Sequence, residues 1–396
     1  MERKLLITEC RGHILTALQE DGKIAELHYS PLRDTKACRI GEIYIGKVRK
    51  ILPNINGAFI EIKNGVECYY SLEEKAEPYF TDKHGKKNLN VGDELMVQVR
   101  KEAVKTKQPT VSGDLNFVGK YVILSSGNRQ IGVSAKLSRD QRERLLALGQ
   151  SFADKDYGMI FRTNAGEAPD NRILSEIQML EEEFHRVLTY GKNRTCFSCV
   201  SHVPDDWLLS LKNLYRQGLT EILVDAVAQN GLLYNKTEAF LTQEQPEDLK
   251  LLRAYTDASY PLCKCYSLEK ATDDALSEKV WMPSGAYLVI QPTEALTVID
   301  VNSGKCLKKK KLFADINREA AKEAARQIRL RNLSGIILID FINMDTEAEK
   351  NELLHELQML LSMDPNPGHV VEMTKLQLVE ITRKKIRKTL KESLYG

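Results

Sequence analysis

Two aspartates share a local setting that suits metal-assisted chemistry on phosphate. Asp300 and Asp340 each close an apolar run, at residues 296–299 and 336–339. An unpaired carboxylate is costly to bury, so we expect both acids at strand ends, where the ligands of open α/β sheets gather. There they would share one Mg²⁺, an ion usually held by one or two carboxylates plus substrate phosphate. Asn302 lies two residues after Asp300, so it would point to the same side and orient a water or a phosphate oxygen.

Basic residues lie on both sides of these acids. One group is Lys305 with residues 308–311, and the other is Arg383, Lys384, Lys385, Arg387, Lys388 and Lys391. A charge run is usually a solvated face, and a lone aspartate in such a context is as often a turn or a helix cap. Two matching acids beside two basic groups favour a function on a polyanion. A metal held there would polarise a phosphoryl oxygen and lower the pKa of a bound water, which indicates phosphodiester hydrolysis.

Other chemistries find less support in the sequence. Ser303 has no histidine placed to activate it, and a glycine-rich phosphate loop is absent from the sequence, which argues against an NTPase. Cys196 and Cys199 have redox or zinc spacing with His202 close behind, and Cys263 and Cys265 form a tighter pair. One interpretation is a zinc site that joins the two pairs; the other is buried or incidental thiols.

The composition is that of a globular protein. The 396 residues are 42% hydrophobic and 28% charged, with a net charge of +2. At about 150 residues per domain, this length predicts two or three domains. Neither a membrane-spanning run nor a signal-peptide pattern is found, so we expect a cytoplasmic protein whose eight cysteines are reduced thiols.

The N-terminal third is predicted to be rich in β-structure. Alternation with period two indicates strands over 4–9, 14–18, 24–28, 41–53, 57–62 and 93–100. Strands at such short spacing suggest a small closed barrel of the OB kind, which binds single-stranded nucleic acid through aromatic residues on a basic face. The candidates for stacking are Tyr44, Phe59, Tyr69 and Tyr70, and those for charge are Lys47, Arg49, Arg100, Lys101 and Lys107. Each aromatic taken alone is more often a core residue.

The remaining chain alternates helices and strands. Helices are predicted over 138–148 with Ser138 as N-cap, and over 170–188, 207–218, 251–255, 316–333 and 347–361. Strands are predicted over 121–124, 158–163, 221–225, 286–291, 295–301 and 335–342. Helices between fully apolar strands after residue 283 predict a layered α/β domain with a buried sheet.

Three long motifs resemble the ribonuclease E/G family of endoribonucleases. They are residues 283–305, 317–342 and 374–390, and they include Ile-Asp-Val-Asn and Ile-Asp-Phe-Ile. Residues 41–59 are similar to the RNA-binding barrel of that family. The resemblance covers residues 4–390, nearly the whole chain, and is closest to the short, RNase G-like members.

The resemblance implies a multidomain α+β and α/β fold. Residues 1–36 and 200–275 would form a discontinuous RNase H-like subdomain. It would be interrupted by an S1-like OB barrel over 37–118 and a 5′-sensor region over 119–199. A DNase I-like catalytic domain would follow over 276–396.

The resemblance also implies roles for individual residues. Asp300 and Asp340 match the family's Mg²⁺ ligands, and Asn302 matches its assisting asparagine. Positions that contact RNA match Phe59, Tyr69 and Lys107, and we add Lys305 as a contact to the RNA backbone. The 5′-monophosphate sensor matches Gly119, Ile123, Arg162 and Thr163.

The chain departs from the family pattern in three places. The zinc-linking CPxC motif after the last basic stretch is absent from this sequence, so a homo-oligomer would form by another route. A basic pair of the sensor is replaced by Ala135 and Lys136, which weakens the expected dependence on the 5′ end. Asn343 stands where a second acid often follows Phe-Ile, which leaves Asp340 as the ligand of that motif.

Together these features predict a Mg²⁺-dependent endoribonuclease of RNA processing and decay that cuts single-stranded RNA. Water activated at the metal would leave 5′-phosphate and 3′-hydroxyl ends. The alternatives are a non-catalytic, ribosome-associated RNA-binding factor and, less strongly, a DNA nuclease. The sequence leaves open which RNAs are cut and whether the protein oligomerises.

Overall fold

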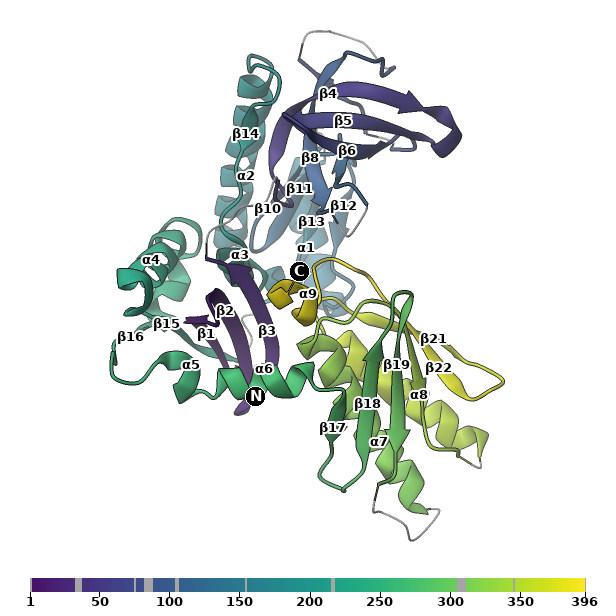
Figure 1. The fold of residues 1–396 in the computed structure, drawn as a ribbon. Helices are drawn as coiled ribbons and strands as arrows, with labels where there is room; N and C mark the ends of the chain where they lie inside the picture. Colours follow the sequence, from purple (N-terminus) through teal and green to yellow (C-terminus); the bar gives the residue numbers. More distant parts are fainter. Residues whose placement is uncertain are drawn as a thin grey trace. The chain divides into compact units, whose positions relative to one another are not determined.

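The computed structural model describes residues 2–32, 38–74, 76–81, 88–103, 107–153, 155–214, 218–304, 311–344 and 346–395. The chain divides into two compact units. Unit 1 comprises residues 1–32 and 218–396, and unit 2 comprises residues 33–217, so unit 2 is inserted into unit 1. Figure 1 shows the elements of both.

The first sheet of unit 1 joins the chain start to a segment more than 200 residues later. It consists of β1 (Arg3–Cys10), β2 (His13–Glu20), β3 (Lys23–Pro31), β15 (Leu219–Asp225) and β16 (Leu252–Tyr255), in the order β16-β15-β1-β2-β3. The first three strands form an antiparallel meander, and β15 and β16 continue it in parallel with β1. Arg11 and Gly12, with φ of 55° and 72°, make the tight turn between β1 and β2.

Two details of this region differ from the sequence prediction. Residues 251–255 were expected to be helical, but four of them form strand β16, because pairing with β15 outweighs the weak local pattern of so short a segment. The second segment of the sheet begins at Leu219, not near residue 200. Strand β14 (Cys199–Ser201) pairs with β4, and helix α3 (Asp206–Asn213) also belongs to unit 2.

The second sheet of unit 1 carries the paired aspartates. Its order is β17-β18-β19-β20-β22-β21. The strands are β17 (Lys279–Trp281), β18 (Tyr287–Pro292), β19 (Leu296–Asn302), β20 (Gly335–Asp340), β21 (Gly368–Met373) and β22 (Leu378–Arg383). Only β19 and β20 pair in parallel, and the other neighbours are antiparallel. The long helix between β19 and β20 accounts for the parallel pair, since such strands need a crossover.

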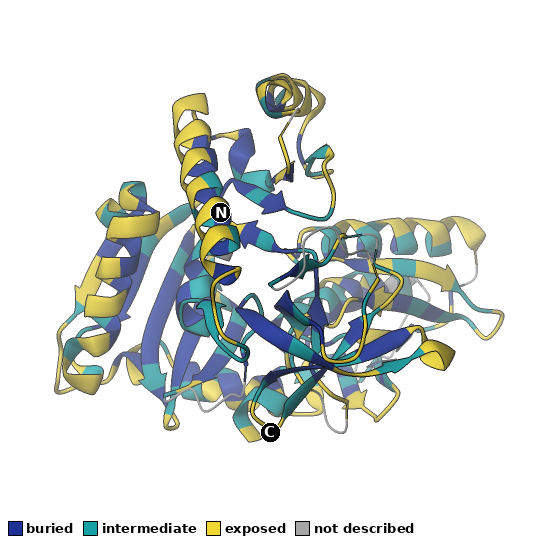
Figure 2. Cartoon of the chain, turned by 90° about the horizontal axis from the view of Figure 1, so that it is seen from above, coloured by how far each residue is buried: buried dark blue, intermediate teal, exposed yellow. Residues whose placement is uncertain are grey.

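Helices α7 (Lys311–Leu330) and α8 (Glu347–Ser362) cover one face of this sheet (Figure 1). Small residues of α7 let the helix approach the strands closely: Ala320, Ala321 and Ala324 are fully buried. They pack with alternate strand residues such as Ile299, Ile337 and Ile381. The residues between them in the strands are half-buried or exposed. Figure 2 colours the whole chain by how far each residue is buried. Among the described residues, this sheet therefore has helices on one face and an open second face, whereas the apolar strands predicted a sheet buried on both sides.

Helix α7 also ties the two sheets of unit 1 together. The Arg329 guanidinium lies 2.6 Å from the Glu26 carboxylate and 3.1 Å from that of Glu20. Arg326 donates a hydrogen bond to the carbonyl of Ile24 at 3.1 Å. These arginines at the end of the helix are thus engaged within the protein. The remaining helices of unit 1 are α4 (Leu232–Glu244), α5 (Leu262–Cys265), α6 (Leu268–Leu276) and α9 (Leu390–Tyr395).

Unit 2 contains a closed barrel of five strands, as the alternation predicted. Strands β4 (Ile43–Leu52), β5 (Gly57–Lys63), β6 (Val66–Ser71), β9 (Thr110–Ser112) and β8 (Glu94–Lys101) follow one another, and β8 pairs again with β4. β7 (Tyr79–Phe80) and β14 extend the sheet at its edges. The closure is consistent with an OB-like fold, and the barrel core includes Ile60, Ile62 and Val97.

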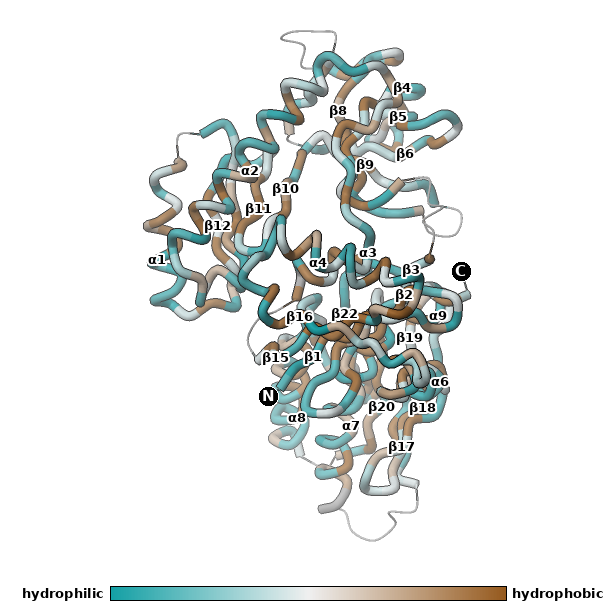
Figure 3. Tube along the Cα trace, turned by 90° about the vertical axis from the view of Figure 1, so that its left-hand side faces the viewer, coloured by the Kyte–Doolittle hydropathy of each residue, from teal (hydrophilic) through white to brown (hydrophobic). Residues whose placement is uncertain are grey.

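A second, four-stranded sheet completes unit 2. Its order is β10-β11-β13-β12, with β10 (Asn116–Val118), β11 (Val122–Ser125), β12 (Ile131–Val133) and β13 (Gly158–Phe161). Helix α1 (Arg139–Gly149) begins with a capping box of Ser138 and Gln141, so the predicted N-cap is confirmed. Helix α2 (Asp170–Gly191) packs its apolar stripe on the sheet, and Figure 3 shows hydrophilic and hydrophobic residues alternating along it. Within the described ranges, none of the helices has the length and apolarity needed to cross a bilayer.

A buried ion pair holds the last strands of unit 1 in place. The Arg383 side chain is 3% exposed and lies 2.9 Å from the Asp364 carboxylate, and it donates further hydrogen bonds to the Asn366 and Leu333 carbonyls. Although Arg383 belongs to the basic C-terminal group in the sequence, its side chain is buried and stabilises the core. Arg318 makes an equally short pair with Glu352 but is 38% exposed.

Replacing the buried arginine should therefore cost far more stability than replacing the exposed one. We expect Arg383→Met to lower the free energy of unfolding by about 3–5 kcal/mol, because the buried Asp364 carboxylate loses the guanidinium that balances its charge. Arg318→Met should cost less than about 1 kcal/mol. Urea denaturation followed by circular dichroism measures both, and equal losses would contradict the assignment.

Candidate active site

The structure brings Asp300 and Asp340 to directly opposite positions on neighbouring strands. They are paired residues in the parallel register of β19 and β20. Directly paired residues point to the same face of a sheet, and here it is the open face, since Ile299 and Ile339 point into the core below α7. Asp340 ends β20 as expected, but β19 continues to Asn302. Asp300 therefore avoids burial through the open face and not through a strand end.

Asn302 completes this constellation. Its side-chain nitrogen donates a hydrogen bond of 2.7 Å to Oδ2 of Asp300, so the two residues share a face, as their spacing predicted. This contact orients the carboxylate of Asp300. The donor set consists of two carboxylates and a carboxamide, all with oxygen atoms, which is the kind of set that fits Mg²⁺.

The two carboxylates also repel each other. Partial burial raises the pKa of Asp340, and the nearby charge of Asp300 raises it further. A cation between the two would relieve this repulsion, so the electrostatics favour binding of a divalent ion. Lys305 and residues 308–310 lie outside the described residues, and the side chain of Lys311 is not described either.

The four candidate aromatics of the barrel differ in their exposure to solvent. Tyr44 and Tyr70 are 0% and 3% exposed and belong to the core, so neither is available for stacking. Phe59 and Tyr69 are half-buried and lie opposite each other on β5 and β6, with ring centroids 6.3 Å apart. The Tyr69 ring lies over Gly57, where a Cβ would meet it at 2.4 Å, so only glycine admits this ring position.

Cationic groups lie beside this aromatic pair. Lys50 is exposed and is paired with Phe59 across the strands. Lys107 is also exposed, and it lies three residues before Thr110, which is paired with Tyr69. Arg100 is instead drawn inward, 3.2 Å from the Asp114 carboxylate. Burial lowers the pKa of Arg100. Arg100 is thus a structural residue, whereas Lys50 was not among the sequence candidates.

The expected sensor residues also lie together. Arg162 donates a hydrogen bond of 2.6 Å to the carbonyl of Gly119, and Thr163 Oγ1 lies 2.9 Å from Ser134 Oγ. Burial lowers the pKa of Arg162, while the carboxylate of Glu176 opposes that change. Ile123 lies on β11 opposite Ile160 of β13, one strand away from the segment that bears Arg162.

Glu176 was not among the residues predicted from the sequence, yet it fixes the backbone of this region. Its carboxylate, 6% exposed, accepts hydrogen bonds of 2.7–2.8 Å from the backbone nitrogens of Lys120, Tyr121 and Val122. Its side chain also fills the space where a Cβ of residue 119 would stand, 2.3 Å from Oε1, which explains the glycine there. On a helix rich in glutamate, no sequence signal singles out the one that faces inward.

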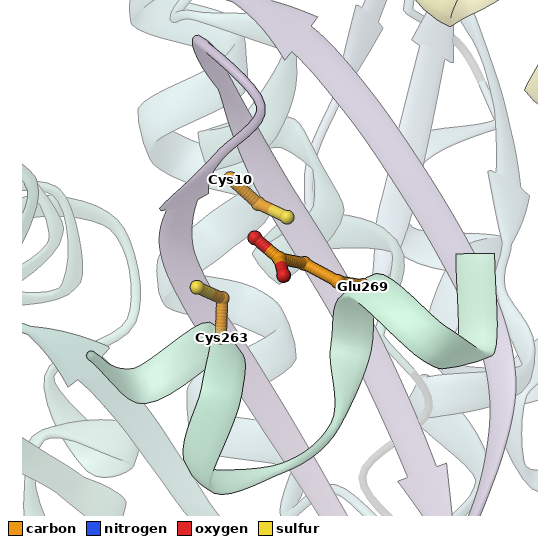
Figure 4. A group of neighbouring side chains, drawn as sticks. All are labelled: Cys10, Cys263 and Glu269. Atoms are coloured by element: carbon orange, nitrogen blue, oxygen red, sulfur yellow. The ribbon is translucent and has the colours of Figure 1, made fainter. Parts of the chain in front are cut away.

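The thiols form groups that their spacing did not predict. The ligand atoms of Cys10, Cys263 and Glu269 lie within 4.8 Å of one another, and the Glu269 carboxylate points between the two sulfurs (Figure 4). Burial raises the pKa of Cys10 to about 11, so this thiol stays protonated at neutral pH and packs in the core of the first sheet.

Cys199 belongs to a second such group. It lies with Glu42 and His202, its sulfur 3.4 Å from Nδ1 of His202. Burial raises the pKa of Cys199 to about 11 as well. In the described part of the chain, the two sequence pairs thus lie in different units, and each has neighbours of its own.

Comparison with known proteins identifies the class to which this fold and this site belong. A family model described as "Ribonuclease E/G family" matches residues 116–386. The chain is 30% identical to Ribonuclease G of Haemophilus influenzae, covering 99% of this chain and 81% of that protein. It is also 30% identical to Ribonuclease G of Escherichia coli K12, covering 100% of this chain and 82% of that protein. With Ribonuclease E of Synechocystis the identity is 30%, and the alignment covers 100% of this chain and 58% of that protein.

The chain belongs to the ribonuclease E/G family. The resemblance seen in the motifs is confirmed, and so is the expected enzyme class, an endoribonuclease. The aspartate pair lies inside the matched segment, as do Arg162 and Thr163, whereas the barrel strands β4 to β9 precede it.

The repulsion between the two acids can be measured directly. Asp300→Asn should lower the pKa of Asp340, because the variant removes the like charge that disfavours ionisation. Carboxyl ¹³C NMR titration of the metal-free protein measures this change. Asp257, whose pKa is lowered by its own hydrogen bonds to Ser259, serves as the internal control and should not move. An unchanged Asp340 titration would show that the carboxylates do not interact.

Proposed function

We propose that this protein is a Mg²⁺-dependent endoribonuclease that cuts single-stranded RNA and leaves 5′-phosphate and 3′-hydroxyl ends. The observation that carries the proposal is the in-register pairing of Asp300 with Asp340 on the open face of a sheet, in a chain of the ribonuclease E/G family. Asp300 and Asp340 would hold the ion, and Asn302 keeps the Asp300 carboxylate oriented. When bound, Mg²⁺ supplies positive charge at the phosphoryl oxygens and lowers the pKa of a coordinated water.

The barrel would hold the RNA through base stacking and contacts to the phosphates. Phe59 and Tyr69 would stack unpaired bases on the barrel, and Lys107 and Lys305 would contact the backbone. The partial exposure of the aromatic pair and the cations beside it support this role for the barrel. A positive face that follows the phosphates also implies binding that weakens with salt.

We also propose that unit 2 senses the 5′ end of the RNA. Arg162 and Thr163, with backbone near Gly119 and Ile123, would bind a 5′-monophosphate. The hydrogen bond from Arg162 to the Gly119 carbonyl supports this role, because it holds the guanidinium in a fixed orientation.

The architecture of the proposed enzyme follows the family. We assign the first sheet of unit 1 to an RNase H-like subdomain, since an antiparallel meander extended by parallel strands suits that fold. The barrel would be the S1-like OB domain, the sheet of β10 to β13 with α1 and α2 the 5′-sensor region, and the segment from Lys279 onward the DNase I-like domain. We place the enzyme in the cytoplasm, in processing of ribosomal RNA and decay of messenger RNA.

Removal of one acid should abolish cleavage without abolishing binding. Asp300→Asn should lower the rate of cleavage of an unstructured RNA by roughly a hundredfold or more, because the charge that holds the cation is lost. RNA affinity should stay within a few-fold, since the barrel is unchanged. The isosteric control Asp274→Asn, at an exposed position on α6, should cleave at the wild-type rate. Full activity of Asp300→Asn would refute the proposal, and binding without Mg²⁺-dependent cleavage by the wild type would support a non-catalytic factor.

The sensor is tested by a ratio of two rates. We expect wild-type protein to cleave a 5′-monophosphate RNA faster than its 5′-hydroxyl counterpart. Arg162→Ala should reduce that ratio by about tenfold or more, because a hydrogen bond to a charged group contributes about 1.5–3 kcal/mol. A ratio is insensitive to a general loss of folded protein. Arg172→Ala, at an exposed position of α2, is the control and should keep the wild-type ratio. A ratio that Arg162→Ala leaves intact would remove the sensor role.

A further inference from the structure

An exposed aromatic pair lies on the same sheet as the paired acids. Trp281 of β17 and Tyr287 of β18 are directly opposite each other, and their ring centroids are 5.0 Å apart with a tilt of 56°. The ammonium of Lys279 lies 4.2 Å from the Trp281 ring centroid and 3.6 Å from that of Tyr287. Trp281 is 61% exposed, so it adds little to the core and is free to contact a ligand.

The strand register connects this pair to the acids. One row across the sheet runs Trp281, Tyr287, Asn302, and the next runs Lys279, Val289, Asp300, Asp340. Residues opposite each other in a sheet share a face, and neighbouring strands are about 4.8 Å apart. Tyr287 is therefore one strand away from Asn302, on the open face, and Trp281 is one strand further. Figure 1 shows β17, β18 and β19 side by side. The other face is occupied, because Leu288 and Ile290 are fully buried in the core.

The chemistry of this group fits one kind of ligand. Aromatic faces stack on any nucleobase that is not paired, and a lysine between them provides a cation for the adjoining phosphate. An oligonucleotide with a phosphodiester at the acid pair would run across β19 and β18 and place a neighbouring base on these rings. No interior contact requires a tryptophan at position 281, since the residues of this strand on the sheet's outer face are exposed.

We infer that Trp281, Tyr287 and Lys279 form a nucleobase-stacking subsite for the RNA strand beside the scissile phosphodiester; this inference rests on the proposed nuclease function. Such a subsite accepts any base but needs it unpaired. It therefore makes cleavage selective for single-stranded RNA at the catalytic sheet itself, in addition to whatever the barrel selects.

Kinetics test the subsite first. Trp281→Ala should lower kcat/KM on an unstructured RNA by about ten- to a hundredfold, mostly through a higher KM, because stacking stabilises bound substrate and transition state alike. Trp281→Phe should restore most of the loss. Tyr260→Ala, at another exposed tyrosine of unit 1, is the matched control and should match wild type. An abasic nucleotide moved through the substrate should impair wild type at one position near the cut and leave Trp281→Ala no worse there.

Fluorescence tests it independently of cleavage. The chain has two tryptophans, and Trp207 is 2% exposed, so a Trp207→Phe variant leaves Trp281 as the reporter. In metal-free buffer, single-stranded RNA should quench this emission, and a fully paired duplex should not. Trp281→Phe, with Trp207 retained, should show no such quenching, which assigns the signal to Trp281.

The outcomes separate this inference from the function on which it rests. Mg²⁺-dependent cleavage with a Trp281→Ala variant within twofold of wild type, and no quenching, would overturn the subsite alone. Absence of cleavage by the wild type would overturn the nuclease proposal, while quenching by RNA would still support the stacking subsite.

Discussion

The parallel pairing of β19 with β20 is the constraint on which the site depends. It sets two carboxylates side by side on one face of a sheet, where partial burial and the charge of Asp300 raise the pKa of Asp340. A shift of one residue in either strand would turn one aspartate into the core below α7. The crossover helix that makes the parallel register possible is therefore as much a part of the site as the acids themselves.

Unit 1 holds that register with interactions that lie far from the acids. The alanines of α7 allow close packing on the strands, and Arg329 at the end of the helix binds Glu20 of β2 and Glu26 of β3. The buried pair of Arg383 and Asp364 fixes β22, the other neighbour of β20. Of the basic residues at the C-terminal end, Arg383 is thus used to stabilise the sheet, whereas Lys384, Lys385 and Lys388 are exposed.

The open face of the sheet allows charged and polar side chains to lie on its central strands. A carboxylate is costly in a strand that is buried on both faces. In a two-layer arrangement, one face of the sheet is buried against the helices and the other is exposed to solvent. On that exposed face, two adjacent rows across the sheet hold the two aspartates with Lys279, and Asn302 with the aromatic pair. In unit 2, by contrast, the aromatic pair of the barrel depends on Gly57 and the proposed sensor on Gly119, where small residues admit a neighbouring side chain.

The sequence by itself determined the local elements, the barrel, the family and the identity of the paired acids, because periodicity, caps and long motifs are local signals. It did not determine which side chains face inward. Tyr44 and Phe59 both lie on alternating strands, and Glu176 is one glutamate among several on its helix, so only packing separates core residues from surface residues. Tertiary structure alone also brought Cys10 to Cys263, turned residues 252–255 into a strand and left one face of the acid-bearing sheet open. Each of these outcomes rests on contacts between segments distant in the chain, and a local pattern carries no record of them.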